Sequence, residues 1–166
     1  MNGGVIDDLI VYKLKKNKYL LVVNASNIEK DWQHLNLLNK KFNTSLKNIS
    51  NNISLLSIQG PNSGNLLKKV SDSSFESLKN YMSCITTIAG IKKVIIASTG
   101  YTGAGGYEIY CDNKNVKHIW DALFNEGKEF NILPIGLAAR DSLRIEMGYC
   151  LYGNEIDENI SPIEAG

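Results

Sequence analysis

The sequence has few cysteines and no excess of charge of either sign, and each absence excludes a class of protein. Only three cysteines occur in 166 residues, and no two of them form a C-x-x-C pair. This pattern excludes a disulfide framework and a zinc ribbon, and it favours a reducing compartment. Lysine plus arginine number 18 against 17 for aspartate plus glutamate, a net charge of +1. Proteins that bind nucleic acid or anionic membrane surfaces by charge carry a marked basic excess, so we expect neither as a partner.

Long apolar runs and targeting segments are also missing. The longest apolar runs, such as residues 20–23 and 94–97, have the length of strands and fall far short of the ~20 residues of a membrane-spanning helix. The first residues show neither the basic nor the apolar region of a secretory signal. Hydrophobic residues make up 43% of the chain and charged residues 21%, which is enough apolar material for a packed core. The composition therefore predicts a soluble globular protein.

Apolar periodicity predicts an α+β fold in which helices pack on antiparallel sheets. Strands are expected over residues 5–14, 19–23, 53–58, 84–89, 92–98 and 107–111, with a weak strand within residues 42–52. Helices are expected from residue 26, from 61 to 70, near 75–82, over 116–124 and over 137–147. Ser26 and Glu29 have the spacing of a capping box, which places the first helix N-cap at Ser26. The segment 149–166 is expected to be irregular, and a polar stretch near residue 50 marks a domain boundary.

Two stretches combine acidic residues or glycines with apolar strands. Asp7 and Asp8 lie in the expected first strand, where adjacent side chains point to opposite faces, so one carboxylate is directed inward. An edge strand with both carboxylates in solvent is the alternative. Residues 98–108 contain four glycines but lack both the Gly-Lys-Ser/Thr end of a phosphate loop and the helix of a dinucleotide fingerprint. Close approach of the backbone to a ligand and a tight hairpin both explain these glycines.

A third stretch places two arginines one helical turn apart. Arg140 and Arg144 alternate with acidic residues, which is typical of a solvated helix face with ion pairs. Arg140 would also suit bidentate recognition of a ligand carboxylate. His34 and His118 have no cysteine or carboxylate at ligand spacing, so no metal site is expected.

Seven strings of residues, in order along the chain, resemble the glycine cleavage system T-protein family of tetrahydrofolate-dependent aminomethyltransferases. The strings are GGVIDDLIVY (3–12), LVVNASN (21–27) with KD (30–31), LSIQGP (56–61), TGYTG (99–103), GYE (106–108), GLAARDSLRIE (136–146) and LYGNEIDE (151–158). Together they cover nearly the whole chain.

The resemblance implies transfer of the methylene carbon from an aminomethyl group on the lipoyl arm of H-protein to tetrahydrofolate, with release of ammonia. Asp8 matches the family's functional aspartate near the folate nitrogens, where a carboxylate can orient the amine and stabilise developing positive charge. Glu108 matches the residue that accepts hydrogen bonds from the donor edge of the pterin. Further folate-pocket positions are matched by Asn24, Tyr101, Arg140 and Tyr152.

The chain departs from the family pattern in one loop and in length. Residues 104–105 are Ala-Gly where the family usually has an acidic pair. Family members are much longer, so the resemblance implies a central fragment that lacks the N-terminal part and the C-terminal β domain. Residues 1–49 would form the second half of a strand-rich α+β domain, and residues 50–166 part of the folate-binding domain.

Related functions remain open at this stage. The alternatives are a folate-dependent demethylase, the folate module of a sarcosine or dimethylglycine oxidase, a non-catalytic folate-binding protein linked to iron-sulfur cluster assembly, and a folding unit that binds nothing. The expected location is the bacterial cytoplasm, or the mitochondrial matrix if the source is eukaryotic.

Overall fold

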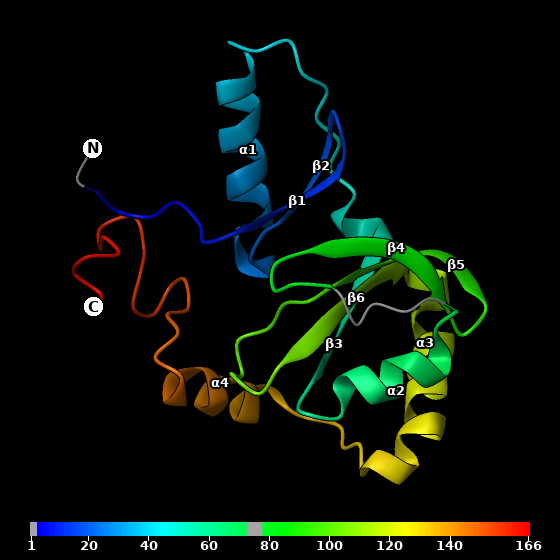
Figure 1. The fold of residues 1–166 in the computed structure, drawn as a ribbon. Helices are drawn as coiled ribbons and strands as arrows, with labels where there is room; N and C mark the ends of the chain where they lie inside the picture. The colour runs from blue at the N-terminus through cyan, green and yellow to red at the C-terminus, as the bar shows by residue number, and fades with distance from the viewer. Residues whose placement is uncertain (1–2, 73–77) are drawn as a thin grey trace. The chain divides into compact units, whose positions relative to one another are not determined.

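The computed structural model describes residues 3–72 and 78–166 (Figure 1). The described residues contain four α-helices and six strands. All six strands pair in antiparallel sheets. The strands are β1 (Ile10–Lys15), β2 (Lys18–Val22), β3 (Ile53–Gln59), β4 (Ser83–Ile88), β5 (Ile91–Ala97) and β6 (Gly106–Asp112). The helices are α1 (Ile28–Asn39), α2 (Ser63–Val70), α3 (Asn113–Gly127) and α4 (Leu137–Glu146). The α+β class predicted from the sequence is confirmed.

The chain divides into two compact units. Unit 1 comprises residues 1–50 and 149–166, and unit 2 comprises residues 51–148. The C-terminal segment thus belongs to the same compact unit as the start of the chain.

Unit 1 consists of the β1–β2 hairpin, helix α1 and the irregular C-terminal segment. The hairpin is antiparallel, and Tyr12 in β1 is buried. The C-terminal segment is bonded to the start of the chain, because the backbone N–H of Val5 donates to the carbonyl of Asp157 at 2.7 Å. Gly4 lies so close to Glu158 that a Cβ atom there would be 1.9 Å from the Glu158 carbonyl oxygen. Glycine at position 4 is therefore required by close backbone packing.

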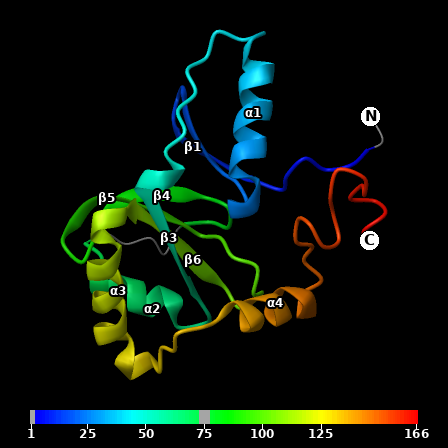
Figure 2. The same ribbon diagram turned by 180° about the vertical axis from the view of Figure 1, so that it is seen from behind.

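Unit 2 is a four-stranded antiparallel sheet in the order β3-β6-β5-β4. Helices α2 and α3 lie on one face of this sheet (Figures 1 and 2). Buried residues of both helices and all four strands form the core, among them Leu67, Ile88, Ile96, Ile109 and Ile119. Because side chains alternate along a strand, the residues next to Ile109 in β6 point to the face opposite the helices.

Several predicted elements differ in their bounds or are absent. The first strand begins at Ile10 rather than at residue 5, so the two aspartates precede it. Helix α1 begins at Ile28 after a 3₁₀ turn over Ala25–Asn27, and its N-cap is Asn27 without a side-chain capping bond. The capping box at Ser26 is therefore wrong. Residues 42–49 form no strand. Of the helix expected near residues 75–82, residues 78–82 are not helical and residues 75–77 lie outside the described part.

Candidate functional site

A cluster of carboxylates and amides in unit 1, which we call the aspartate cluster, consists of Asp7, Asp8, Asn24, Asn27 and Asp31. The side-chain amide of Asn24 donates to Asp7 Oδ1 at 2.8 Å and to Asp8 Oδ1 at 2.6 Å, and the Asn24 backbone N–H donates to Asp7 Oδ2 at 3.0 Å. The amide of Asn27 adds a bond of 2.5 Å to Asp7 Oδ1. One asparagine thus joins two consecutive carboxylates.

The environment of Asp7 and Asp8 sets their proton affinities in opposite directions. Partial burial raises the pKa of Asp7, but the bonds from Asn24 and Asn27 outweigh it and hold the pKa below its ordinary value. Partial burial also raises the pKa of Asp8. The bond from Asn24 opposes that effect, the charge of Asp7 adds to it, and the pKa of Asp8 lies above its ordinary value. Asp8 is exposed, and no hydrogen bond to its Oδ2 is found in the described part of the chain.

Asp31 is the buried member of the cluster. Its residue is 4% exposed, and the side chain lies within hydrogen-bond reach of Asp7. Burial, the hydrogen bond with Asp7 and the charge of Asp7 raise the pKa of Asp31 to about 6, while the charge of Lys30 opposes the shift.

Tyr152 contacts the side chain of Lys30 in α1. The Lys30 ammonium lies 2.5 Å from the Tyr152 hydroxyl and 4.0 Å from the centre of its ring. Glu158 lies 3.8 Å from the same ammonium. Desolvation lowers the pKa of Lys30, but Tyr152 and the charges of Glu158 and Asp31 outweigh it and raise the pKa above its ordinary value. Lys30 thus fixes the position of Tyr152, a contact that the sequence analysis did not identify.

Glu108 in unit 2 is held by two hydroxyl groups on the sheet face opposite α2 and α3. Its Oε2 accepts from Thr99 at 2.6 Å and from Tyr110 at 2.9 Å. Glu108 pairs with Ser57 of β3 and Ala97 of β5 in the sheet register. No hydrogen bond to Oε1 is found among the described residues. One carboxylate oxygen is thus oriented by the protein, and the other can accept a bond from a ligand.

Gln59 explains two of the glycines in the loop that joins β5 to β6. Its amide donates to the carbonyl of Thr99 at 3.2 Å and accepts from the hydroxyl of Thr102 at 3.2 Å. A Cβ at Gly100 or Gly106 would lie 2.1 Å or 2.3 Å from Gln59 Oε1. The loop connects antiparallel neighbours, as a hairpin does, and the side chain that approaches these glycines belongs to the protein. Gln59 lies in the string LSIQGP (56–61), and no sequence pattern predicts this role.

Tyr101 and Arg140 contact each other in unit 2. The Arg140 guanidinium carbon lies 4.7 Å from the centre of the Tyr101 ring, which is a cation–π geometry. Arg140 is exposed, whereas Arg144 is 5% exposed and bonded to Asp141 at 2.7 Å. The expectation of a solvated helix face is therefore wrong for Arg144, which is buried.

The predicted site residues thus fall into four local arrangements. In unit 1, Asp8 is joined to Asn24, and Tyr152 is joined to Lys30. In unit 2, Tyr101 contacts Arg140, and Glu108 is bonded to its two hydroxyl partners. Arg140, Asp8 and Glu108 each keep polar atoms without a recorded bond in the described part of the chain.

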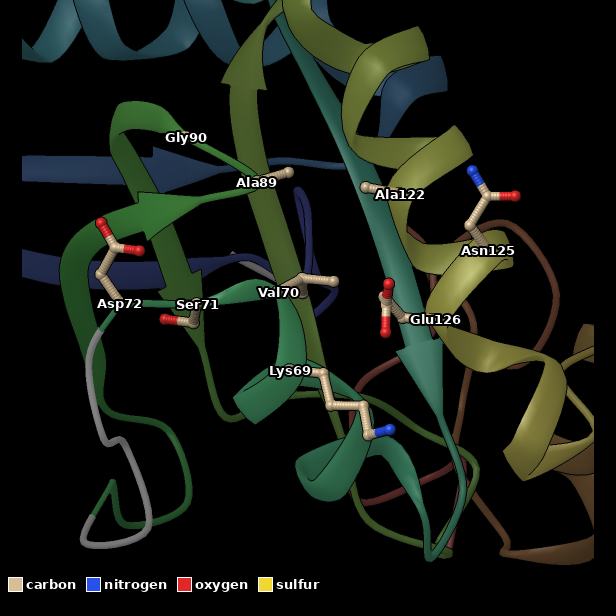
Figure 3. Close-up of a pocket in the computed structure, with 9 residues that line it drawn as sticks. All are labelled: Lys69, Val70, Ser71, Asp72, Ala89, Gly90, Ala122, Asn125 and Glu126. Atoms are coloured by element: carbon tan, nitrogen blue, oxygen red, sulfur yellow. The ribbon is translucent and has the colours of Figure 1, made fainter.

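Other features of the described residues add no second site. A hollow between α2, α3 and the β4–β5 turn is lined in part by Lys69, Asp72, Asn125 and Glu126 (Figure 3). It contains none of the predicted site residues. Within residues 3–72 and 78–166 there is no group of three or more histidine, cysteine or acidic side chains that could hold a metal ion. No helix in the described part is both long and apolar enough to cross a membrane.

The fold is α+β, and the candidate residues of each unit include a hydrogen-bonded carboxylate, Asp8 in unit 1 and Glu108 in unit 2. The chain belongs to the GCVT N-terminal domain family, which matches residues 1–166. Curated relatives named aminomethyltransferase are 49% identical over 164 residues in Flavobacterium psychrophilum and 51% identical over 165 residues in Bacteroides fragilis. Each alignment covers 99% of this chain and 45% of the relative. The chain therefore spans less than half the length of these relatives.

Solved structures agree with this assignment. The crystal structure of glycine cleavage system aminomethyltransferase T from Bartonella henselae matches with a TM-score of 0.81 and 29% identity, over 98% of this chain and 42% of that one. Heterotetrameric sarcosine oxidase from Corynebacterium sp. U-96 matches with a TM-score of 0.58 and 17% identity, over 80% of this chain and 70% of that one. The second match shows a shared fold alone. The aminomethyltransferase family predicted from the motifs is confirmed, and with it the prediction of an enzyme family.

Proposed function

We propose that this chain is part of a tetrahydrofolate-dependent aminomethyltransferase of the glycine cleavage system. In the proposed reaction the methylene carbon passes from the aminomethyl-lipoyl arm of H-protein to tetrahydrofolate, and ammonia is released. The observation that carries the proposal is Asp8, an exposed carboxylate that Asn24 holds through Oδ1. Support also comes from the relatives named aminomethyltransferase.

Asp8 would act on the amine that accepts the one-carbon unit. A fixed carboxylate can accept a hydrogen bond from an attacking N–H group and stabilise the positive charge that develops on the nitrogen. The raised pKa of Asp8 also makes its carboxylate a better proton acceptor than an ordinary aspartate. Asn24 contributes orientation, because its bond fixes one oxygen of the Asp8 carboxylate.

The residues of unit 2 fit a pterin with its benzoyl-glutamate tail. Glu108 Oε1 can accept a hydrogen bond from a pterin N–H donor while Oε2 stays bonded to Thr99 and Tyr110. Tyr101 offers an aromatic face, and the Arg140 guanidinium has donors for a carboxylate of the glutamate tail. Tetrahydrofolate supplies the nucleophilic nitrogens of the reaction. Tyr152, held by Lys30, is proposed as a further folate contact.

The partner and location follow from the same assignment. H-protein would deliver the aminomethyl group on its lipoyl arm, so a lipoylated H-protein is the proposed protein partner. The named relatives come from bacteria, and we place the protein in the bacterial cytoplasm.

The role of Glu108 can be tested by isothermal titration with 5-formyltetrahydrofolate, using the protein from the complete reading frame that contains this chain. Glu108→Gln should weaken binding at least about tenfold, because an amide NH₂ turned toward a pterin donor leaves that donor unpaired. Glu126→Gln, an exposed position on α3, makes the same charge change and should leave the affinity unchanged. No saturable binding by the wild type, or equal affinity for both variants, would contradict the assignment.

A further inference from the structure

Asp31 is a buried carboxyl group that the proposed reaction does not use. It lies in α1, is 4% exposed, and its Oδ2 is buried without a hydrogen-bond partner among the described residues. Its side chain lies within hydrogen-bond reach of the carboxyl group of Asp7. Two ionised carboxylates have no proton to share and repel each other, so the buried position of Asp31 needs an explanation.

We propose that Asp31 is a positioning residue for Asp8: it carries a proton, donates it in a hydrogen bond to Asp7, and thereby fixes the carboxylate that holds the Asn24 amide against Asp8. The consequence for transfer rests on the proposed function. The hydrogen-bond relay from Asp31 through Asp7 and Asn24 to Asp8 is a property of unit 1 and does not depend on that function.

The distribution of donors decides which member of the pair keeps the proton. Asp7 accepts three bonds from N–H groups of Asn24 and Asn27, and each bond favours its ionised form. For Asp31 no comparable set of donors is found within the described residues, and its burial disfavours the ionised form. The opposite pKa shifts of the two groups agree with this distribution.

Lys30 is the charged group that opposes this assignment. Its ammonium favours an ionised Asp31, but it is bonded to the Tyr152 hydroxyl and lies 3.8 Å from Glu158. Among the described residues, the charged groups that act on Asp31 are Asp7, which favours the protonated form, and Lys30, which favours the ionised form. Burial adds to the effect of Asp7, and Asp31 is therefore neutral below about pH 6.

Carbon-13 NMR of the aspartate carboxyl groups tests the proton directly in this chain, with Asp31→Asn and Asp7→Asn used to assign the signals. We expect the Asp31 signal to titrate with a midpoint near 6, and the Asp7 signal to titrate below its ordinary value of 3.8. An Asp31 signal that titrates at or below 3.8 would overturn the proposal. This measurement needs neither folate nor H-protein.

The effect on Asp8 is tested by kinetics of two variants in the protein from the complete reading frame. Asparagine at position 31 keeps a donor toward Asp7 and has no proton to lose, whereas alanine removes the donor. At about pH 5, where Asp31 is protonated, Asp31→Asn should retain kcat within about twofold, and Asp31→Ala should lower kcat about tenfold with little change in the KM for tetrahydrofolate. The pH dependence of kcat between about pH 5 and pH 7 should flatten in Asp31→Asn.

The outcomes separate the two proposals. Equal loss of kcat in both variants, or no loss in Asp31→Ala, would refute the positioning role. If Asp31→Ala does not fold, the pH profile of Asp31→Asn still decides the question, because an unchanged profile contradicts it. Absence of aminomethyl transfer in the wild type would refute the proposed function and would leave the NMR result on Asp31 standing.

Discussion

Asn24 stabilises two adjacent negative charges with a single nitrogen atom. A primary amide has two N–H bonds on one nitrogen, and here one points to Asp7 and the other to Asp8. A hydroxyl group has only one hydrogen to donate, and a carboxylate at this position would add charge. In the Asn-Ala-Ser-Asn string, the side chains of Asn24 and Asn27 therefore fix Asp7 by hydrogen bonds. Ser26 is not the cap of helix α1.

We expect the free energy of unfolding to depend on pH, because Asp31 binds its proton more tightly in the folded chain than in the unfolded chain. The pKa of Asp31 is 3.8 in the unfolded chain and about 6 in the folded chain, so the folded chain releases this proton at a higher pH. As the pH rises through this interval the folded state binds more protons than the unfolded state, so the free energy of unfolding falls, by at most about 3 kcal/mol. Asp7 contributes in the opposite direction, because its lowered pKa favours the folded state above about pH 4, and this contribution is lost as the pH falls further.

Urea denaturation of this chain between about pH 4 and pH 8 measures the effect. The loss of stability from about pH 4 to pH 6 should be smaller in Asp31→Asn than in the wild type. Asp121→Asn, which removes an exposed carboxylate paired with Lys117, should follow the wild-type curve to within about 0.5 kcal/mol. Identical pH dependence in the wild type and Asp31→Asn would contradict the account.

At the scale of elements, the start of the chain is held by the C-terminal segment. Val5 is bonded to Asp157, and Gly4 packs against the backbone of Glu158. These contacts fix the segment that carries Asp7 and Asp8, which lies before β1 and has no strand partner of its own. The aspartate cluster therefore depends on residues more than a hundred positions away in the sequence.

Gly4→Ala tests this dependence, and Gly64→Ala in unit 2 is a control with the opposite expected sign. Gly4→Ala places a Cβ 1.9 Å from a backbone oxygen, so one segment must move, and we expect a loss of about 2–4 kcal/mol. Gly64→Ala lies in α2, where the new Cβ would make only an ordinary contact of 3.6 Å with Tyr107, and we expect a gain of about 0.5–1 kcal/mol. Chemical denaturation of both variants measures these changes. A stability of Gly4→Ala equal to that of the wild type would refute the close packing.

Apolar spacing and turn residues in the sequence predicted most of the strands and helices. The β1–β2 and β4–β5 hairpins, β3, β6, α3 and α4 all follow apolar spacings or turn residues that are visible in the sequence. The errors arose where tertiary hydrogen bonds decide the structure. Asn24 and Asn27 are bonded to Asp7 across the chain, so the turn before α1 departs from the capping-box pattern at Ser26. The alternation rule failed for Asp7 and Asp8 because they precede the strand.

At the scale of the whole molecule, the motifs predicted the family but not the partners of each site residue. Asp8, Glu108 and Arg140 were selected by their place in motifs. The roles of Thr99 and Tyr110 beside Glu108, and of Lys30 beside Tyr152, require a three-dimensional structure. Burial of Asp31 was not visible either, because an acidic residue in an amphipathic helix ordinarily faces solvent. The chain spans less than half the length of its named relatives, so the activity that we propose is assayed on the protein from the complete reading frame that contains this chain.

The most direct test of the central claim is the transfer of the methylene carbon from aminomethyl-lipoyl H-protein to tetrahydrofolate by that protein, with the wild type compared with Asp8→Asn. Asparagine preserves the size of the side chain and removes the charge that would stabilise the attacking nitrogen. We predict that turnover falls at least about a hundredfold, while the affinity for 5-formyltetrahydrofolate stays within about threefold of the wild type. Unchanged turnover in Asp8→Asn, or a wild type that binds folate and transfers no methylene carbon, would contradict the account.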